Sequence, residues 1–248
     1  MVLLYGRHAC FEALLNKCRV INKIFVTNNI LKELSKIESL NIDLFQKIIS
    51  VVDRVFLDNL FEQSTVHQGI VIDAQPLGNV PLENLIKKKK KSQTIVILDQ
   101  VVDPQNVGSI LRLCRVFEAD GIVMTSSHAP KETGSIAKVA SGALEIIPRC
   151  VVPNLAMAIR KLKEAGFWCI GLTEHGDKSM RDIDLTGKIA LVTGNEGTGM
   201  RQLTQKLCDF NAFLPTSSQF STLNATMATA ITLYEVFIAQ NFAKKNEK

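Results

Sequence analysis

The stretch that decides the fold is TIVILDQVVDPQNVGSILRLC, which runs from Thr94 to Cys114. Its first six residues are almost all apolar, as expected of a strand that is covered on both faces of a sheet. Its second half carries apolar residues at i, i+3, i+4 and i+7, namely Val107, Ile110, Leu111 and Cys114, and this spacing predicts an amphipathic helix. A buried strand followed by such a helix is the repeating unit of α/β proteins.

The same alternation continues along the chain. Further apolar runs lie at 121–125, 167–172, 189–193 and 211–214, and helical patterns separate most of them. They predict a mainly parallel sheet with helices on both faces. Before this region, a helix at 7–15 and strands at 23–26 and 69–72 predict a smaller α/β unit.

Proline and glycine at 75–81 interrupt regular structure. We therefore expect a small domain at 1–78, a lysine-rich linker at 79–92, a larger domain at 93–243 and a frayed tail at 244–248.

Composition narrows the class of protein. The hydrophobic fraction of 46% and the charged fraction of 21% are those of a globular protein. No apolar stretch is long enough for a bilayer, and charge interrupts the first residues too early for a signal peptide, so the expected compartment is the cytoplasm. The six cysteines show no metal-binding spacing, which favours a reduced protein without a structural metal.

The net charge of +5 depends on one segment, because Lys87–Lys91 contributes five positive charges. Such a run is usually a solvated linker. It is also compatible with a flexible contact to RNA phosphates. Charge therefore permits a nucleic-acid partner without indicating one.

Polar and glycine residues follow three predicted strands at their carboxyl ends. The first segment holds Asn106, expected to cap the following helix, and Arg112; the second is the turn Gly194–Gly199; the third, 214–226, includes Asn224. Each alone suits a helix cap, a surface arginine or a tight turn. The turn matches neither the dinucleotide-binding nor the P-loop pattern. Because the carboxyl ends of parallel strands share one edge of a sheet, the three together predict a ligand site.

The order of these motifs resembles a known family. N-x-G-x-x-x-R, G-x-E-G-x-G and P-x₇-L-N are similar to the three motifs of the SpoU (TrmH-type) branch of the SPOUT methyltransferases, and residues 138–145 and 232–235 support the match. Residues 4–9 and 67–70 resemble the amino-terminal substrate-binding domain of the subgroup that methylates a guanosine of 23S ribosomal RNA. The resemblance extends from about residue 3 to residue 240.

The resemblance implies a carboxy-terminal trefoil knot, an exception to the rule that chains stay unknotted. It implies an enzyme that moves a methyl group from S-adenosylmethionine to a ribose 2′-hydroxyl, and it implies a homodimer. The catalytic residues would be Asn106, Arg112, Glu196, Thr222 and Asn224. The cofactor would contact Thr173, Gly194, Leu214, Leu223 and Asn224, and RNA would contact Arg7, His8, His67 and Gln68.

Two points stay open at this stage. In the family Arg112 activates the hydroxyl, but a guanidinium is protonated at ordinary pH, so a charged Arg112 that stabilises the developing alkoxide or grips a phosphate is equally consistent. In addition, Thr216, Ser218, Phe220 and Thr222 replace the methionine, glycine, valine and serine usual in the third motif. These replacements predict altered packing of that loop.

Three other functions compete with methylation of a 23S guanosine. One is ribose methylation of transfer RNA, and another is RNA binding without catalysis on the same scaffold. A third is methylation of guanine N1, a reaction that calls for an acidic base near the acceptor, whereas these motifs offer Arg112 and amides.

Overall fold

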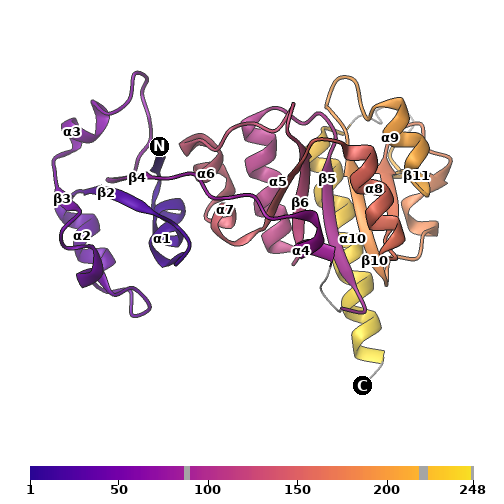
Figure 1. Cartoon of the computed structure of the whole chain (residues 1–248), viewed down its shortest axis with the longest axis horizontal. Helices are drawn as coiled ribbons and strands as arrows, with labels where there is room; N and C mark the ends of the chain where they lie inside the picture. The colour runs from indigo at the N-terminus through magenta and orange to yellow at the C-terminus, as the bar shows by residue number, and fades with distance from the viewer. Residues whose placement is uncertain (87–89, 218–222, 247–248) are drawn as a thin grey trace. The chain divides into compact units, whose positions relative to one another are not determined.

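The structure, a computed structural model, describes residues 1–86, 90–217 and 223–246. These residues form two units, each assembled from two segments of the chain (Figure 1). The first unit joins Met1–Gly78 to Lys131–Ile146, and the second joins Asn79–Pro130 to Ile147–Lys248. The boundaries at 78 and 92 inferred from composition stay a prediction, while the contacts within the chain group 131–146 with the amino-terminal segment.

The second unit is built on a seven-stranded sheet in which every strand pairs in parallel. Its spatial order is β7-β6-β5-β10-β8-β11-β9. The strands are β5 (Gln93–Leu98), β6 (Gly121–Thr125), β7 (Arg149–Val152), β8 (Trp168–Leu172), β9 (Lys178–Ser179), β10 (Lys188–Thr193) and β11 (Phe210–Phe213). The predicted mainly parallel α/β sheet is confirmed.

Helices cover this sheet, which explains its continuous apolar strands. All residues of β5 and β6 are buried. Ile95 and Ile97 of β5 belong to one core cluster with Leu155 and Ile159. The helices are α4 (Leu82–Ile86), α5 (Pro104–Val116), α8 (Leu155–Glu164), α9 (Gln202–Leu207) and α10 (Ala225–Asn246), with a 3₁₀ turn at Met180–Asp182. Helix α5 packs against α10 and α8 against α9, and Figure 1 shows α8 in front of the sheet and α10 behind it.

Two strands of this sheet were not predicted from the apolar runs of the sequence. They are β7 and β9, which lie at its two edges. An edge strand has one neighbour and is short, so it needs no long apolar run. β7 is four residues between Pro148 and Pro153, and β9 is two residues.

The order of strands also defines where a ligand would bind. From β5 the chain builds outward through β6 and β7, and it then returns to the other side of β5 with β8, β10 and β11. The order in which the chain adds strands to the sheet therefore reverses between β5 and β10. In open α/β sheets the crevice beyond the carboxyl ends of the strands at such a point is the usual ligand site.

The first unit contains a four-stranded sheet of order β1-β4-β2-β3. Only β2 and β3 pair in parallel among its described ladders. Its strands are β1 (Val2–Tyr5), β2 (Ile21–Val26), β3 (Ile49–Val51) and β4 (Ile70–Ala74), and its helices are α1 (Arg7–Leu15), α2 (Asn28–Leu34), α3 (Arg54–Asp58), α6 (Gly134–Ala140) and α7 (Ala143–Ile146), with a 3₁₀ turn at Ile42–Phe45. The predicted helix at 7–15 is confirmed.

A buried ion cluster holds the segment 131–146 within the first unit. Arg19, whose side chain is 0% exposed, pairs with Glu132 at 2.5 Å and also with Glu145, and both carboxylates are 2% exposed. Asn16 donates to the Glu145 carboxylate at 2.8 Å. Helix α6 lies so close to β1 that a Cβ at Gly134 would overlap the carbonyl oxygen of Leu3. The first unit thus includes residues far apart in the sequence.

The trefoil knot implied by the family resemblance stays a prediction. In the described part of the chain, no helix combines the length and apolar character that a membrane span requires.

Candidate active site

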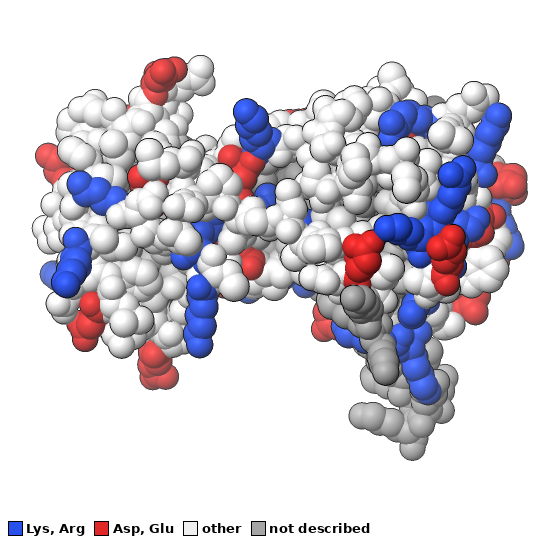
Figure 2. Space-filling view, viewed as in Figure 1, with Lys and Arg blue, Asp and Glu red and all other residues white. Residues whose placement is uncertain are grey.

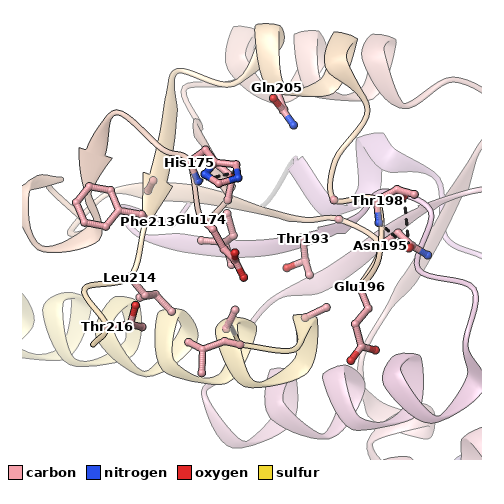
Figure 3. A pocket seen from close by; sticks show the side chains of 18 of the residues that line it. Glu174, His175, Thr193, Asn195, Glu196, Thr198, Gln205, Phe213, Leu214 and Thr216 are labelled. Atoms are coloured by element: carbon pink, nitrogen blue, oxygen red, sulfur yellow. Dashed lines mark hydrogen bonds between the residues drawn. The ribbon is translucent and has the colours of Figure 1, made fainter. Parts of the chain in front are cut away.

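A cavity of about 720 Å³ lies at the carboxyl edge of the parallel sheet (Figure 3). The segments after β8, β10 and β11 line it, together with the start of α10. Its lining residues lie at 172–175, 193–199, 205, 212–217, 223, 225 and 228. Its volume falls within the roughly 300–1,000 Å³ of small-molecule sites.

The loop after β10 is a tight, internally bonded turn. The side-chain oxygen of Asn195 accepts from the backbone N–H groups of Gly197 at 2.9 Å and Thr198 at 3.2 Å, as Figure 3 shows. The backbones of Asn195 and Gly199 bond to each other in both directions. A Cβ at Gly194 would overlap the backbone of Gly199 and Met200, so only glycine fits there.

Two contacts attach this turn to the end of β5. The side-chain NH₂ of Asn195 donates to the carbonyl of Gln100 at 3.1 Å. Asp99, fully buried, accepts from the backbone N–H of Arg201 at 2.9 Å and from its Nε at 2.7 Å. Asp99 was not among the predicted site residues. A buried carboxylate needs a charged or hydrogen-bonding partner, so an acidic residue at the end of a buried apolar strand indicates one. These contacts fix one wall of the cavity.

Asn106 and Glu196, two predicted catalytic residues, meet beside this turn. Asn106 Nδ2 donates to Glu196 Oε2 at 3.3 Å, and its Oδ1 accepts from the Thr226 hydroxyl at 3.0 Å. The expectation that Asn106 caps its helix is wrong, because Asp103 is the N-cap of α5 and Pro104 follows it. Proline favours the first helical position, where no N–H is needed. Asn106 therefore lies in the first turn with its side chain free to contact other segments.

Arg112 lies on α5 with an exposed side chain. Within the described residues it forms no hydrogen bond or ion pair, and it does not line the cavity. Its guanidinium is thus available to a molecule that approaches the site.

The third motif is described only in part. Thr222, together with Ser218 and Phe220, lies outside the described residues. Asn224 caps α10, since its Oδ1 accepts from Met227 N at 2.7 Å. The other predicted cofactor residues, Thr173, Gly194, Leu214 and Leu223, all line the cavity, as does Thr216.

The residues predicted to contact RNA lie in the first unit. Gln68, with a positive φ of 57°, accepts from the backbone N–H of Arg7 at 2.9 Å, and Arg7 also pairs with Glu33. His8 is exposed. Arg7, His8 and Gln68 therefore belong to one neighbourhood, where the entry to α1 meets the entry to β4.

His67 differs from these three residues because it is buried, with 2% of its surface exposed. Its Nδ1 accepts from Gly69 N at 3.0 Å, so the ring proton lies on Nε2, which bonds Asp58 at 3.0 Å. Both ring nitrogens thus have partners within the unit.

Candidate metal ligands are a separate question. Among the described residues, no group of three or more His, Cys, Asp or Glu side chains is arranged to hold a metal ion.

A cavity with a glycine-rich turn, placed where the strand order of a parallel α/β sheet reverses, is typical of enzymes that bind a small molecule. The family described as SpoU rRNA Methylase matches residues 93–234, and the domain described as RNA 2′-O ribose methyltransferase substrate binding matches residues 3–80. The chain belongs to the SpoU rRNA methylase family. The predicted enzyme class, an RNA 2′-O-ribose methyltransferase, is confirmed.

Similar sequences cover most of this chain. A protein of Synechocystis described as an uncharacterized tRNA/rRNA methyltransferase is 35% identical over 97% of this chain, which spans 63% of that protein's length. A 23S rRNA (guanosine-2′-O-)-methyltransferase of Coxiella burnetii is 35% identical over 94% of each chain. One from Pseudomonas aeruginosa is 37% identical over 74% of this chain and 75% of its own.

Solved structures share the fold. The SpoU methyltransferase AviRb of Streptomyces viridochromogenes, solved with its cofactor AdoMet, has a TM-score of 0.78 at 23% identity, covering 96% of this chain and 90% of its own. An AdoMet-bound rRNA methyltransferase of Sinorhizobium meliloti has a TM-score of 0.76 at 22% identity, covering 95% and 86%. S-adenosylmethionine, the predicted cofactor, is the one that this family uses.

Proposed function

We propose that this chain methylates the ribose 2′-hydroxyl of a guanosine in 23S ribosomal RNA. The observation that carries the proposal is the cavity at the reversal of the sheet, with the Asn106–Glu196 pair beside it. The relatives named as 23S rRNA guanosine methyltransferases support the choice of RNA. An RNA substrate of this kind implies action in the cytoplasm.

The described residues fit S-adenosylmethionine. Leu172, Leu214 and Leu223 give the cavity an apolar part suited to an adenine ring, and the turn at Gly194 keeps side chains out of it. The bound cofactor supplies an activated methyl group. The protein then has to hold a ribose hydroxyl in line with it and assist the loss of the hydroxyl proton.

We assign Arg112 to the acceptor rather than to the cofactor. Its side chain is exposed and does not line the cavity. A guanidinium is protonated at ordinary pH. A charged Arg112 would stabilise negative charge that develops on the ribose oxygen, or it would grip a neighbouring phosphate.

In the first unit, RNA would contact Arg7, His8 and Gln68. His67, which is buried and lies next to Gln68 in the sequence, would hold this segment in place. The face shown in Figure 2 carries basic and acidic side chains interspersed, not one continuous basic patch. Phosphate attraction alone would therefore give little selectivity. Recognition would depend on the local group around Arg7.

A row of exposed apolar side chains on α10 supports the predicted homodimer. Met227, Ile231 and Tyr234 are spaced at i, i+4 and i+7 and are 56%, 42% and 50% exposed, and Phe242 follows at 59%. Exposed apolar rows of this kind mark interaction surfaces. We propose that two copies of the chain bury this face.

The test is to map 2′-O-methylated nucleotides in total RNA from cells with and without the gene. Loss of one 23S guanosine methylation is the expected result. Loss in transfer RNA would replace the substrate, an alternative that is compatible with the name of the Synechocystis relative, which gives both kinds of RNA.

Purified protein would test the chemistry directly. With labelled S-adenosylmethionine and RNA, label should appear on ribose after digestion to nucleosides. Label on guanine N1 would overturn the proposed site chemistry, and no label with any RNA would favour binding without catalysis.

A further inference from the structure

Thr226 is the last residue of the third strand-end segment, 214–226, and it is not one of the predicted site residues. It is the second residue of α10, two positions after the third motif, and it is not among the residues that line the cavity. Its hydroxyl nevertheless contacts the site, because it donates to Asn106 Oδ1 at 3.0 Å. This bond joins α10 to the first turn of α5.

Thr229 and Thr232, which lie further along α10, both donate their hydroxyls within the helix, although the Thr229 hydroxyl also lies 2.8 Å from that of Thr193. Thr229 donates to the carbonyl of Ala225 at 2.7 Å, and Thr232 donates to that of Ala228 at 2.8 Å. Both bonds return to the preceding turn, as threonine hydroxyls in helices usually do. The Thr226 hydroxyl instead points to another helix.

The chemistry of an amide explains what this bond does. The Asn106 side chain has one end that accepts and one end that donates, and Glu196 as a carboxylate can only accept. Asn106 must therefore present its Nδ2 to Glu196 and its Oδ1 to Thr226. Two bonds, at 3.0 and 3.3 Å, hold the amide in this orientation.

Among the described residues, Asn106 is the one hydrogen-bond partner of the Glu196 side chain. Its side chain is exposed on the turn after β10, and Figure 3 shows it pointing away from the hydrogen bonds that Asn195 and Thr198 make within that turn. If the Thr226 hydroxyl were lost, one longer bond would have to orient both Asn106 and Glu196. The Glu196 carboxylate would then be free to leave its place.

We propose that Thr226 is a positioning residue for methyl transfer, which acts through Asn106 on Glu196. The inference rests on the proposed role of Asn106 and Glu196 in the reaction. It adds a link from α10 to the first and second motifs, so that residues from all three strand-end segments are held in one hydrogen-bonded chain.

The test compares Thr226→Val, which keeps the shape and removes the hydroxyl, with Thr226→Ser, which keeps the hydroxyl. Loss of one neutral hydrogen bond corresponds to about a 3- to 10-fold fall in turnover. We expect this fall in T226V, near-normal turnover in T226S and unchanged affinity for S-adenosylmethionine by calorimetry. The matched control is Thr232→Val, because within the described part of the chain the Thr232 hydroxyl bonds to α10 alone, and its turnover should not change.

A double-mutant cycle separates positioning from a structural effect. In an Asn106→Ala background, T226V should cause no further loss, because the residue through which it acts is gone. The proposal is overturned if the T226V loss persists in that background, if T226V alone matches the wild type, or if T226S loses as much as T226V.

Failure of the proposed function would look different from failure of this inference. In that case the wild-type protein would itself transfer no methyl group to an RNA ribose. If the wild type is active but N106A and Glu196→Gln retain full turnover, the role of this pair fails, and T226V has no catalytic residue to position. An inactive N106A beside a fully active T226V would reject only the role of Thr226.

Discussion

Two arginines, one in each unit, lie in opposite environments. Arg19 in the first unit is completely buried, and its Nε and both terminal nitrogens bond to Glu132, Glu145 or the carbonyl of Gln75. Arg112 in the second unit is exposed, with no partner among the described residues. A charge that is fully paired inside the protein maintains structure, whereas a charge left open is available to a substrate.

The comparison also shows how the first unit is completed. Glu132 and Glu145 lie in the segment 131–146, which falls within the range matched by the methylase family and not within that of the substrate-binding domain. A substrate-binding unit cut at residue 78 would leave Arg19 buried without its two carboxylates. We expect such a fragment to be unstable.

The largest effect is expected from Arg19→Ala. It removes the buried cation that neutralises two buried carboxylates, which costs about 3–5 kcal/mol in unfolding free energy. Urea denaturation measures the loss. Arg7→Ala is the matched control, because the Arg7–Glu33 pair is about half exposed and pairs of that kind contribute roughly 0–1 kcal/mol. Equal losses in both variants would contradict the structural role of the cluster.

Alkylation of buried cysteines shows which unit unfolds in the Arg19→Ala variant. Burial, and then the charge of Glu145, raises the pKa of Cys10 far above its usual range, while burial raises the pKa of Cys114 to about 12. A thiol with a pKa of about 12 has only ~0.01% thiolate at pH 8, so alkylation there should be negligible in the native protein. In the variant, Cys10 should react before Cys114, whereas the exposed Cys18 reacts in the native protein as well. Equal labelling of Cys114 would mean that the units unfold together.

Arg112→Ala tests the other side of the comparison. We expect turnover to fall by about 10²–10³-fold, the usual cost of removing a group that stabilises charge in a transition state. Cofactor affinity should stay near that of the wild type, because Arg112 does not line the cavity. Calorimetry with S-adenosylmethionine separates the two effects. Arg115→Ala, one turn further along the exposed side of α5, is the control.

A parallel fall of affinity and turnover in Arg112→Ala would contradict the assignment of this residue to the acceptor. Arg112→Lys tests the electrostatic role, because lysine keeps the charge but loses the planar donor pair. We expect its turnover to lie between those of Arg112→Ala and the wild type.

The sequence predicted the fold well where one strand or helix carries its own pattern. The apolar runs at 94–99 and 189–193 gave two central strands, and the polar residues after them gave the edge where the cavity lies. Pairing between distant residues left no such pattern. Arg19 and Glu145 are 126 positions apart, and no pattern in the sequence around either residue indicates that both are buried. Asn106 was misread as a cap because Asp103 and Pro104, three and two residues earlier, start the helix instead.

Asp99→Asn should have a smaller effect than the two arginine variants. Asparagine keeps the shape, but it is neutral and accepts through one oxygen only, so its NH₂ group faces one of the two Arg201 donors. Since the Arg201 side chain is 40% exposed, solvent screens part of the attraction, and a loss of about 1–2 kcal/mol is expected. Because the pair anchors the turn that walls the cavity, cofactor affinity should fall several-fold. Unchanged affinity would show that the turn holds its shape without this anchor.

The smallest effect is expected from Asn224→Ala, which compares two helix caps. Asn224 caps α10 beside the cavity, where its Oδ1 accepts from the N–H of the residue three positions later. Asn154 caps α8 in the same way, accepting from Met157 N at 3.1 Å. Each alanine variant should lose about 1 kcal/mol of stability. Only Asn224→Ala should also weaken S-adenosylmethionine binding and turnover, because the adjacent Leu223 lines the cavity. If the two variants behave alike in thermal unfolding, calorimetry and methyl transfer, then Asn224 is a cap and nothing more, and the open side of the site consists of Arg112, Asn106 and Glu196.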